Sequence, residues 1–392
     1  MASLFTEEEE ETLDALAEEV DAAHAPADGD VQPRNNPDLF GHEEAEKAIL
    51  ADFNAGRMPH ALIIGGPPGI GKATLAYRLT RFFLAQGSDG QGPSLFGDAA
   101  PPESLYIGPE HPVFRRVASG GHADMLTIER EFDEKKGKMK RDIAVEQTWE
   151  IPRFMRKTAA EGGWRVVIVD GAEDINRSSE NSLLKILEEP PLKSLLILVT
   201  TQPGALLPTT RSRCRLIQLQ PLEDRVISQL VEKYLSALPA DQKTGLARLA
   251  EGSIGKALQF HQEGGLAIYA GLLEVLSNLP EMDVPRARDL TEKLGRYDAE
   301  RAYDTACEIL TGWCSYIARM QARGLPLAGF LPDDGAVFTK LATAYPANHF
   351  VSAGEKMTQL FRQTAGLNLD KRQALMNAFL MLQKPDFALP NL

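Results

Sequence analysis

The stretch that most constrains the fold is residues 60–84, where a glycine-rich turn joins a short apolar segment, ALII, to a helical pattern. The apolar segment predicts a buried strand, and the turn GGPPGIGK fits the spacing G-x-x-x-x-G-K. Glycines at Gly66, Gly69 and Gly71 let backbone N–H groups face one anion, and the helix N-terminus adds partial positive charge. The sequence therefore predicts a phosphate-binding loop in which Lys72 reaches the outer phosphates.

The residue after this lysine departs from the motif. A Ser or Thr hydroxyl ordinarily binds the nucleotide's magnesium there, but this chain has Ala73, and a hydroxyl follows only at Thr74. One step along a helix turns a side chain by about 100°, so Thr74 does not take the missing position. We expect Mg²⁺-dependent hydrolysis to be weak or absent.

A second strand signal, WRVVIVD, covers residues 164–170 and ends in Asp170. Its continuous apolar run is typical of a central parallel strand, and open α/β sheets bind ligands at the carboxyl ends of such strands. An Asp at this point commonly serves the magnesium of a phosphate-loop protein. In motor ATPases of this design the next residue is an acid that activates water, but here it is Gly171, and we expect Glu173 to point elsewhere.

Strand and helix signals alternate up to residue 219, and only helix signals follow. We predict an acidic disordered tail and linker at 1–33, an α/β module with a parallel sheet at 34–219, a small helical lid at 220–264 and an all-helical domain at 265–392. Within these segments the patterns predict a helix over 145–160 that is broken or begun at Pro152, and a closing helix over 367–382.

The net charge of −13 is concentrated at one end of the chain. Residues 1–30 hold eleven acidic side chains and no Lys or Arg, so the remaining residues carry a net charge of only −2. Such a run is typical of a solvated tail. The overall charge thus argues neither for nor against nucleic-acid binding, and direct DNA contact stays open because no basic stripe with interleaved aromatic residues stands out.

Targeting and redox signals are sparse. No apolar run is long enough to span a bilayer, and we see no charged-then-apolar leader. The three cysteines do not form a disulfide framework, and Cys307 and Cys314, seven residues apart, are expected to be buried structural thiols rather than metal ligands. We therefore expect a reduced, cytoplasmic protein with no membrane association.

Four motifs together, GGPPGIGKATLA, VVIVDGAEDIN, NSLLKILEEPP and TRSRC, resemble the clamp-loader branch of the AAA+ superfamily. The resemblance is clearest over about residues 36–220 and leaves out the N-terminal tail. It implies an AAA+ module, a helical lid and a helical collar for oligomerisation. It also implies a role in DNA replication, in which a ring of five subunits uses ATP to open a sliding clamp and place it on primed DNA.

The partners implied by this resemblance are the motor (gamma/tau) and delta subunits of a hetero-pentameric DNA polymerase III clamp loader. The sliding clamp and primer–template DNA would be reached through that complex, at the replisome in the cytoplasm. No cofactor is required by this reading, and statically bound ATP or ADP remains an alternative. A four-cysteine zinc site found in relatives is not expected, because residues 86–123 contain no cysteine.

Individual residues can be matched to the family. The degenerate nucleotide-binding set comprises Gly66, Gly69, Gly71, Lys72, Ala73, Thr74 and Asp170. Arg213 matches the arginine of the Ser-Arg-Cys motif, which the resemblance implies is a catalytic finger acting in trans on the ATP of a neighbouring subunit. Motor subunits carry an arginine at the place of Gly255 to sense the γ-phosphate.

These departures leave two hypotheses. The losses at Ala73, Gly171 and Gly255 beside the retained Arg213 favour a non-hydrolysing stator subunit without ATPase activity of its own. The alternative is an active AAA+ ATPase motor subunit, motivated by the intact Lys72 and Asp170.

Overall fold

The computed structural model describes residues 32–88, 101–133, 138–140, 142–296, 299–327, 329–331 and 334–384. Contacts divide the chain into two compact units, one made of residues 29–227 with 251–255 and the other containing residues 228–250 and 256–392. The predicted acidic tail lies almost wholly outside the described residues. The division into module, lid and collar stays a prediction.

The first unit is built on a parallel sheet of five strands in the order β2-β5-β6-β1-β7. The strands are β1 (Ala61–Gly65), β2 (Met125–Ile128), β5 (Arg165–Asp170), β6 (Ser194–Thr200) and β7 (Arg215–Gln218). Helix α2 (Glu43–Asn54) precedes β1. The elements between the strands are α3 (Lys72–Ser88), α4 (Pro112–Ala118), the small hairpin β3 (Phe132–Asp133) and β4 (Lys138–Met139), α5 (Val145–Met155), α6 (Arg177–Glu188) and α7 (Pro208–Arg211). This arrangement confirms the predicted α/β fold class.

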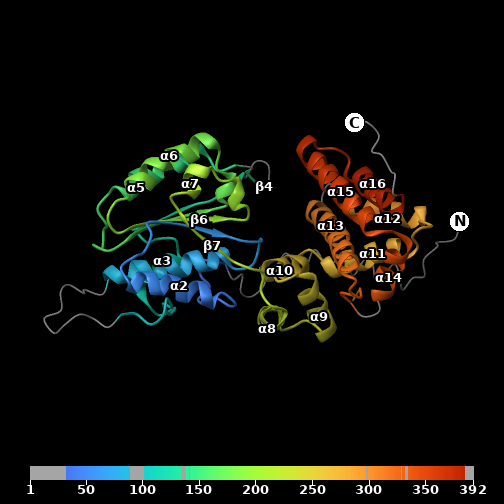
Figure 1. Cartoon of the computed structure of the whole chain (residues 1–392), viewed down its shortest axis with the longest axis horizontal. Coiled ribbons are helices and arrows are strands. Elements are labelled where there is room, and N and C mark those ends of the chain that lie inside the picture. Colours follow the sequence, from blue (N-terminus) through green and yellow to red (C-terminus); the bar gives the residue numbers. More distant parts are fainter. Residues whose placement is uncertain are drawn as a thin grey trace. The chain divides into compact units, whose positions relative to one another are not determined.

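The middle residues of the central strands are apolar because helices cover both faces of the sheet, with α2 and α3 on one side and α5 and α6 on the other (Figure 1). Successive side chains of a strand point to opposite faces. Along β6, Leu195 and Ile197 therefore join the core formed with α3, whereas Leu196 and Leu198 join the core formed with α5 and α6. All seven residues of β6 are buried.

Helix α5 corrects one prediction, because it passes through Pro152 without a break and ends at Met155 rather than at residue 160. Proline removes one hydrogen bond from a helix interior. The neighbouring Ile151 and Met155 are 0% and 2% exposed, and their packing under the sheet offsets that loss.

Among the described residues after the sheet, the regular elements are all helices, as predicted. They are α8 (Asp224–Tyr234), α9 (Ala240–Leu249), α10 (Ile254–Gln262), α11 (Gly265–Ser277), α12 (Val284–Leu294), α13 (Glu300–Arg323), α14 (Gly335–Ala344), α15 (Ala347–Leu367) and α16 (Lys371–Gln383). None of those described is long and apolar enough to cross a membrane.

The predicted closing helix over 367–382 is wrong at its start. Helix α15 ends at Leu367, and Asn368 adopts a left-handed conformation with φ of 54°. The Asp370 side chain then accepts hydrogen bonds from the N–H groups of Arg372 and Gln373, which begins α16. A turn over residues 368–370 therefore precedes the closing helix, which begins four residues later than predicted.

Candidate functional site

The predicted phosphate loop lies between β1 and α3, and its glycines have the backbone that the turn requires. Gly69 and Gly71 have φ of 70° and 102°, a region that residues with a Cβ rarely adopt. Helix α3 begins at Lys72, whose side chain is buried and whose Nζ donates to the Pro67 carbonyl at 2.6 Å. The lysine is therefore turned back onto its own loop.

Four successive carbonyls of this loop accept hydrogen bonds from the chain itself. Besides Lys72 on Pro67, the Ser253 Oγ donates to the Pro68 carbonyl at 2.9 Å, and the Gly255 N–H donates to the Gly69 carbonyl at 2.9 Å. The buried His42 ring places Nε2 2.7 Å from the Ile70 carbonyl. The loop is held in shape by hydrogen bonds of the protein.

The segment 251–255 touches the loop backbone to backbone. A Cβ on Gly255 would lie 2.7 Å from the Gly69 Cα, and a Cβ on Gly69 would lie 2.9 Å from the Gly255 Cα. No real Cβ tolerates such distances from backbone atoms, so two glycines are needed for this contact. The position where motor subunits are expected to carry an arginine is here a point of close backbone approach.

Acidic groups surround Lys72 at the carboxyl end of the sheet. Burial lowers the Lys72 pKa, and the negative charges of Glu173 and Asp170 oppose that shift. Burial also raises the pKa of Asp170, with the charge of Glu129 adding to the effect. The charges of Asp170 and Lys72 therefore interact, whereas a role of Asp170 in binding a nucleotide stays a prediction.

The Glu173 side chain, which we expected to point elsewhere, is bound to the end of β6. Its Oε1 accepts hydrogen bonds from the N–H of Thr201, at 3.0 Å, and from the Thr201 hydroxyl, at the end of β6. Burial raises the Glu173 pKa, but the hydrogen bonds from Thr201 and its neighbours outweigh burial and lower it overall. Glu173 is thus an ionised group close enough to influence Lys72, held by the strand next to Asp170.

These residues fit a phosphate better than they fit a catalytic magnesium ion. The loop and the start of α3 form the arrangement of a phosphate cradle. Ala73 offers no hydroxyl at the place where the motif supplies a magnesium ligand. One usual magnesium ligand of such a loop is therefore missing, while the Asp170 carboxylate is present. Weak or absent Mg²⁺-dependent hydrolysis stays a prediction.

Arg213 lies at the opposite end of the sheet. In the parallel pair β1–β7, Leu62 is level with Arg215 and Gly65 is level with Gln218. Arg213 precedes Arg215, whereas the phosphate loop follows Gly65. At about 3.3 Å per residue, the two lie at least about 10 Å apart along the strands. The sheet does not bring Arg213 to the chain's own phosphate loop.

The Arg213 side chain is anchored at its position by three groups. Nη2 donates to Glu188 Oε1 at 2.8 Å, and Nη1 donates to the Thr209 carbonyl at 3.0 Å and to the Ser212 hydroxyl at 3.4 Å. Glu188 is the last residue of α6. The sequence analysis assigned no role to Glu188, although this residue lies within the segment LEEPP. It also did not predict the contacts of His42 and Ser253 with the phosphate loop.

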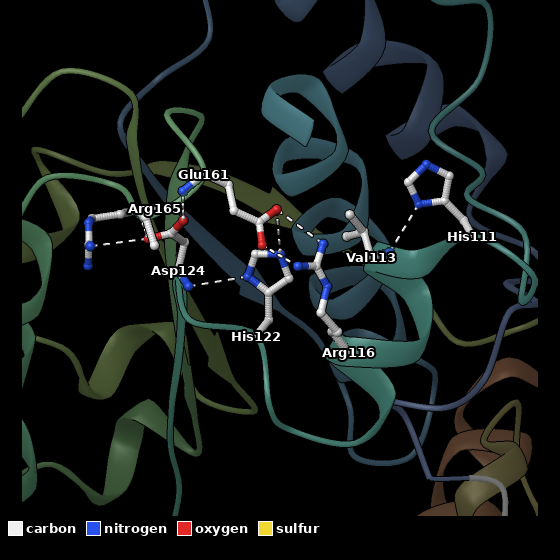
Figure 2. Close-up of polar contacts among 8 residues, drawn as sticks. His111, Val113, Arg116, His122, Asp124, Glu161 and Arg165 are labelled. Carbon is white, nitrogen blue, oxygen red and sulfur yellow. Dashed lines mark hydrogen bonds and ion pairs between the residues drawn. The ribbon is translucent and has the colours of Figure 1, made fainter. Parts of the chain in front are cut away.

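A buried polar network at the other end of β2 and β5 was also not foreseen (Figure 2). Asp124 accepts hydrogen bonds from the N–H groups of Ala160 and Glu161 and lies 3.1 Å from Arg165 Nη2. His122 is 3% exposed, and its Nδ1 accepts from the Asp124 N–H at 3.2 Å while its Nε2 lies 3.9 Å from Glu161 Oε2. Most contacts fasten the backbone of the loop before β5, so we interpret the network as structural.

The chain is similar to known bacterial replication proteins. The family model described as "DNA polymerase III, delta subunit" matches residues 41–223. The DNA polymerase III subunit delta' of Pseudomonas aeruginosa is 30% identical over 270 residues, which cover 69% of this chain and 76% of that protein. The subunit delta' of Escherichia coli is 32% identical over 55% of this chain and 58% of its own length. The E. coli subunit tau is 29% identical over 69% of this chain and 39% of its own length.

Proposed function

Because the chain belongs to the family of DNA polymerase III delta' subunits, we propose that it is a non-hydrolysing stator subunit of a clamp loader. In this role it supplies Arg213 in trans to the ATP of a neighbouring motor subunit of the gamma/tau kind. A delta subunit would complete the pentamer, and the assembled ring would load the sliding clamp onto primed DNA in the cytoplasm.

The observation that carries the proposal is the placement of Arg213. The residue precedes β7, at the end of the sheet opposite to the chain's own phosphate loop. A side chain anchored there can contact a nucleotide only if that nucleotide is bound to another subunit. A guanidinium on the neighbour's γ-phosphate stabilises the charge that builds up in the transition state of phosphoryl transfer.

The chain's own nucleotide loop supports the same reading. Lys72 bonds to Pro67, and Gly255 takes the place of the γ-phosphate-sensing arginine and bonds to Gly69. We propose that no nucleotide or Mg²⁺ is required to keep this loop in shape. ATP or ADP bound at the loop would be a static ligand, held by the backbone of the loop and by Lys72.

The proposal is tested by the DNA-stimulated ATPase rate of a clamp loader reconstituted with the motor and delta subunits. Arg213→Ala is expected to leave assembly intact and to lower the hydrolysis rate at the neighbouring ATP site by roughly 10³–10⁵-fold. The total ATPase rate should then fall by the share that this one site contributes. Lys72→Ala in the same chain is the matched variant and should leave the rate unchanged.

Two results would contradict the proposal. An unchanged rate with Arg213→Ala would remove the finger assignment. A rate that falls with Lys72→Ala, together with ATP hydrolysis by the chain alone, would identify an active motor subunit instead.

A further inference from the structure

The guanidinium of Arg213 is oriented by a carboxylate from another element. Glu188 ends α6, 25 residues before Arg213, and its Oε1 accepts from Nη2 at 2.8 Å. We propose that Glu188 is a positioning residue that fixes the finger for the neighbour's γ-phosphate. This inference rests on the proposed trans function of Arg213.

The first argument is the number of donors. A guanidinium has five N–H donors in a fixed planar fork. Thr209 and Ser212 engage Nη1, and Glu188 engages Nη2, so three donors are used within the described part of the chain. Two donors remain, which is the number that a bidentate contact with a phosphate needs. Glu188 can therefore stay bound to Arg213 while the finger acts.

The second argument is the position of Glu188 on its helix. The C-terminus of a helix carries partial negative charge, so carboxylates in the last turn destabilise it. Helix α6 nevertheless ends in Glu188, followed by Glu189. The helix itself gains nothing from a carboxylate there, and the charge of Arg213 supplies the compensating interaction.

The third argument is the strength of the contact. The side chains of Arg213 and Glu188 are 35% and 53% exposed, so water screens the pair. Such a contact restrains the side chain without locking it. Thr209 and Ser212 contact only Nη1, and the contact of Glu188 with Nη2 limits rotation of the guanidinium about that nitrogen.

The test uses the reconstituted clamp loader with DNA and clamp, measuring kcat and KM for ATP. Glu188→Ala is expected to lower turnover about twofold to fivefold at the one site that Arg213 serves, because an exposed ion pair contributes little. The total kcat should therefore fall by less than it does in Arg213→Ala, with KM unchanged. Glu188→Gln keeps an acceptor oxygen and should restore part of kcat. Glu189→Ala is the matched control, since that side chain makes no hydrogen bond to any residue that the structure describes, and it should have no effect.

The double variant Glu188→Ala/Arg213→Ala separates positioning from a general loss of structure. If Glu188 acts through Arg213, the kcat of the double variant should be no lower than the kcat of Arg213→Ala alone. A kcat that is unchanged or raised in Glu188→Ala would overturn the proposal, and a raised kcat would mean that Glu188 competes with the phosphate. If Arg213→Ala itself has no effect, the trans function fails as well, which is a distinct result.

Discussion

The contact between Gly255 and Gly69 can be tested by adding a single methyl group. In Gly255→Ala the new Cβ would lie 2.7 Å from the Gly69 Cα and 3.3 Å from the Gly69 carbonyl oxygen. Both are backbone atoms, which cannot turn aside as a side chain can. The segment 251–255 must therefore move away from the phosphate loop.

The cost follows from what that movement breaks. The hydrogen bonds from Gly255 to Gly69 and from Ser253 to Pro68 contribute about 0.5–1.5 kcal/mol each. Alanine in the first turn of α10 returns up to about 1 kcal/mol relative to glycine. We expect a net loss of about 1–2 kcal/mol in the free energy that keeps the loop closed, equivalent to a factor of about 5–30 in the closing equilibrium.

Amide hydrogen exchange at residue 255 reads this equilibrium directly, and urea denaturation gives the global free energy of unfolding. Gly312→Ala is the matched control, because it also lies in a helix, α13, and its Cβ would meet nothing within 4 Å. That substitution should stabilise the chain by up to about 1 kcal/mol. If Gly255→Ala proves equally stabilising and leaves exchange at residue 255 unchanged, the two glycines do not hold the loop.

Two further predictions concern buried titratable groups. Burial lowers the pKa of His122 from its ordinary value of 6.5, and the negative charge of Glu161 opposes that shift. The contribution of His122 to folding stability is therefore present above about pH 6.5 and is lost as the pH falls through the folded-state pKa of His122. In urea titrations between pH 7.5 and 5.5, His122→Asn should therefore lose less stability than the parent, a difference of at most about 1.4 kcal/mol per pH unit; equal slopes would refute the assignment. Burial raises the pKa of the Cys307 and Cys314 thiols to about 12, so mass spectrometry should find neither alkylated by iodoacetamide at pH 8 in the folded chain and both alkylated in denaturant. Rapid alkylation of either Cys307 or Cys314 in the folded chain would contradict the burial of these two thiols.

The sheet was predictable because its central strands are covered on both faces. The apolar run of β5 predicted that strand to within one residue, because side chains on both of its faces are buried. Helix ends were less predictable. The apolar pattern runs across Asn368, and only the capping role of Asp370 marks the break.

The candidate site was predictable where residues are adjacent in the chain. The glycines and Lys72 form one loop, as their spacing indicates. The hydrogen bond between Ser253 and Pro68 joins residues 185 positions apart in the sequence. Patterns of neighbouring residues contain no information on contacts over such a sequence separation. Glu188 meets Arg213 only because α6 ends level with the turn before β7, a consequence of helix length and strand register.

The strand order also governs how the chain matures during synthesis. Strand β1 ends at residue 65, but its two neighbours, β6 and β7, begin at residues 194 and 215. At about 5–20 residues per second, a ribosome needs roughly 6–26 s to extend the chain from β1 to the start of β6. During that interval a fully apolar segment, ALII, has neither of its pairing partners. A nascent chain arrested before residue 194 should therefore be captured by chaperones that bind apolar segments, and release should follow once β7 has emerged.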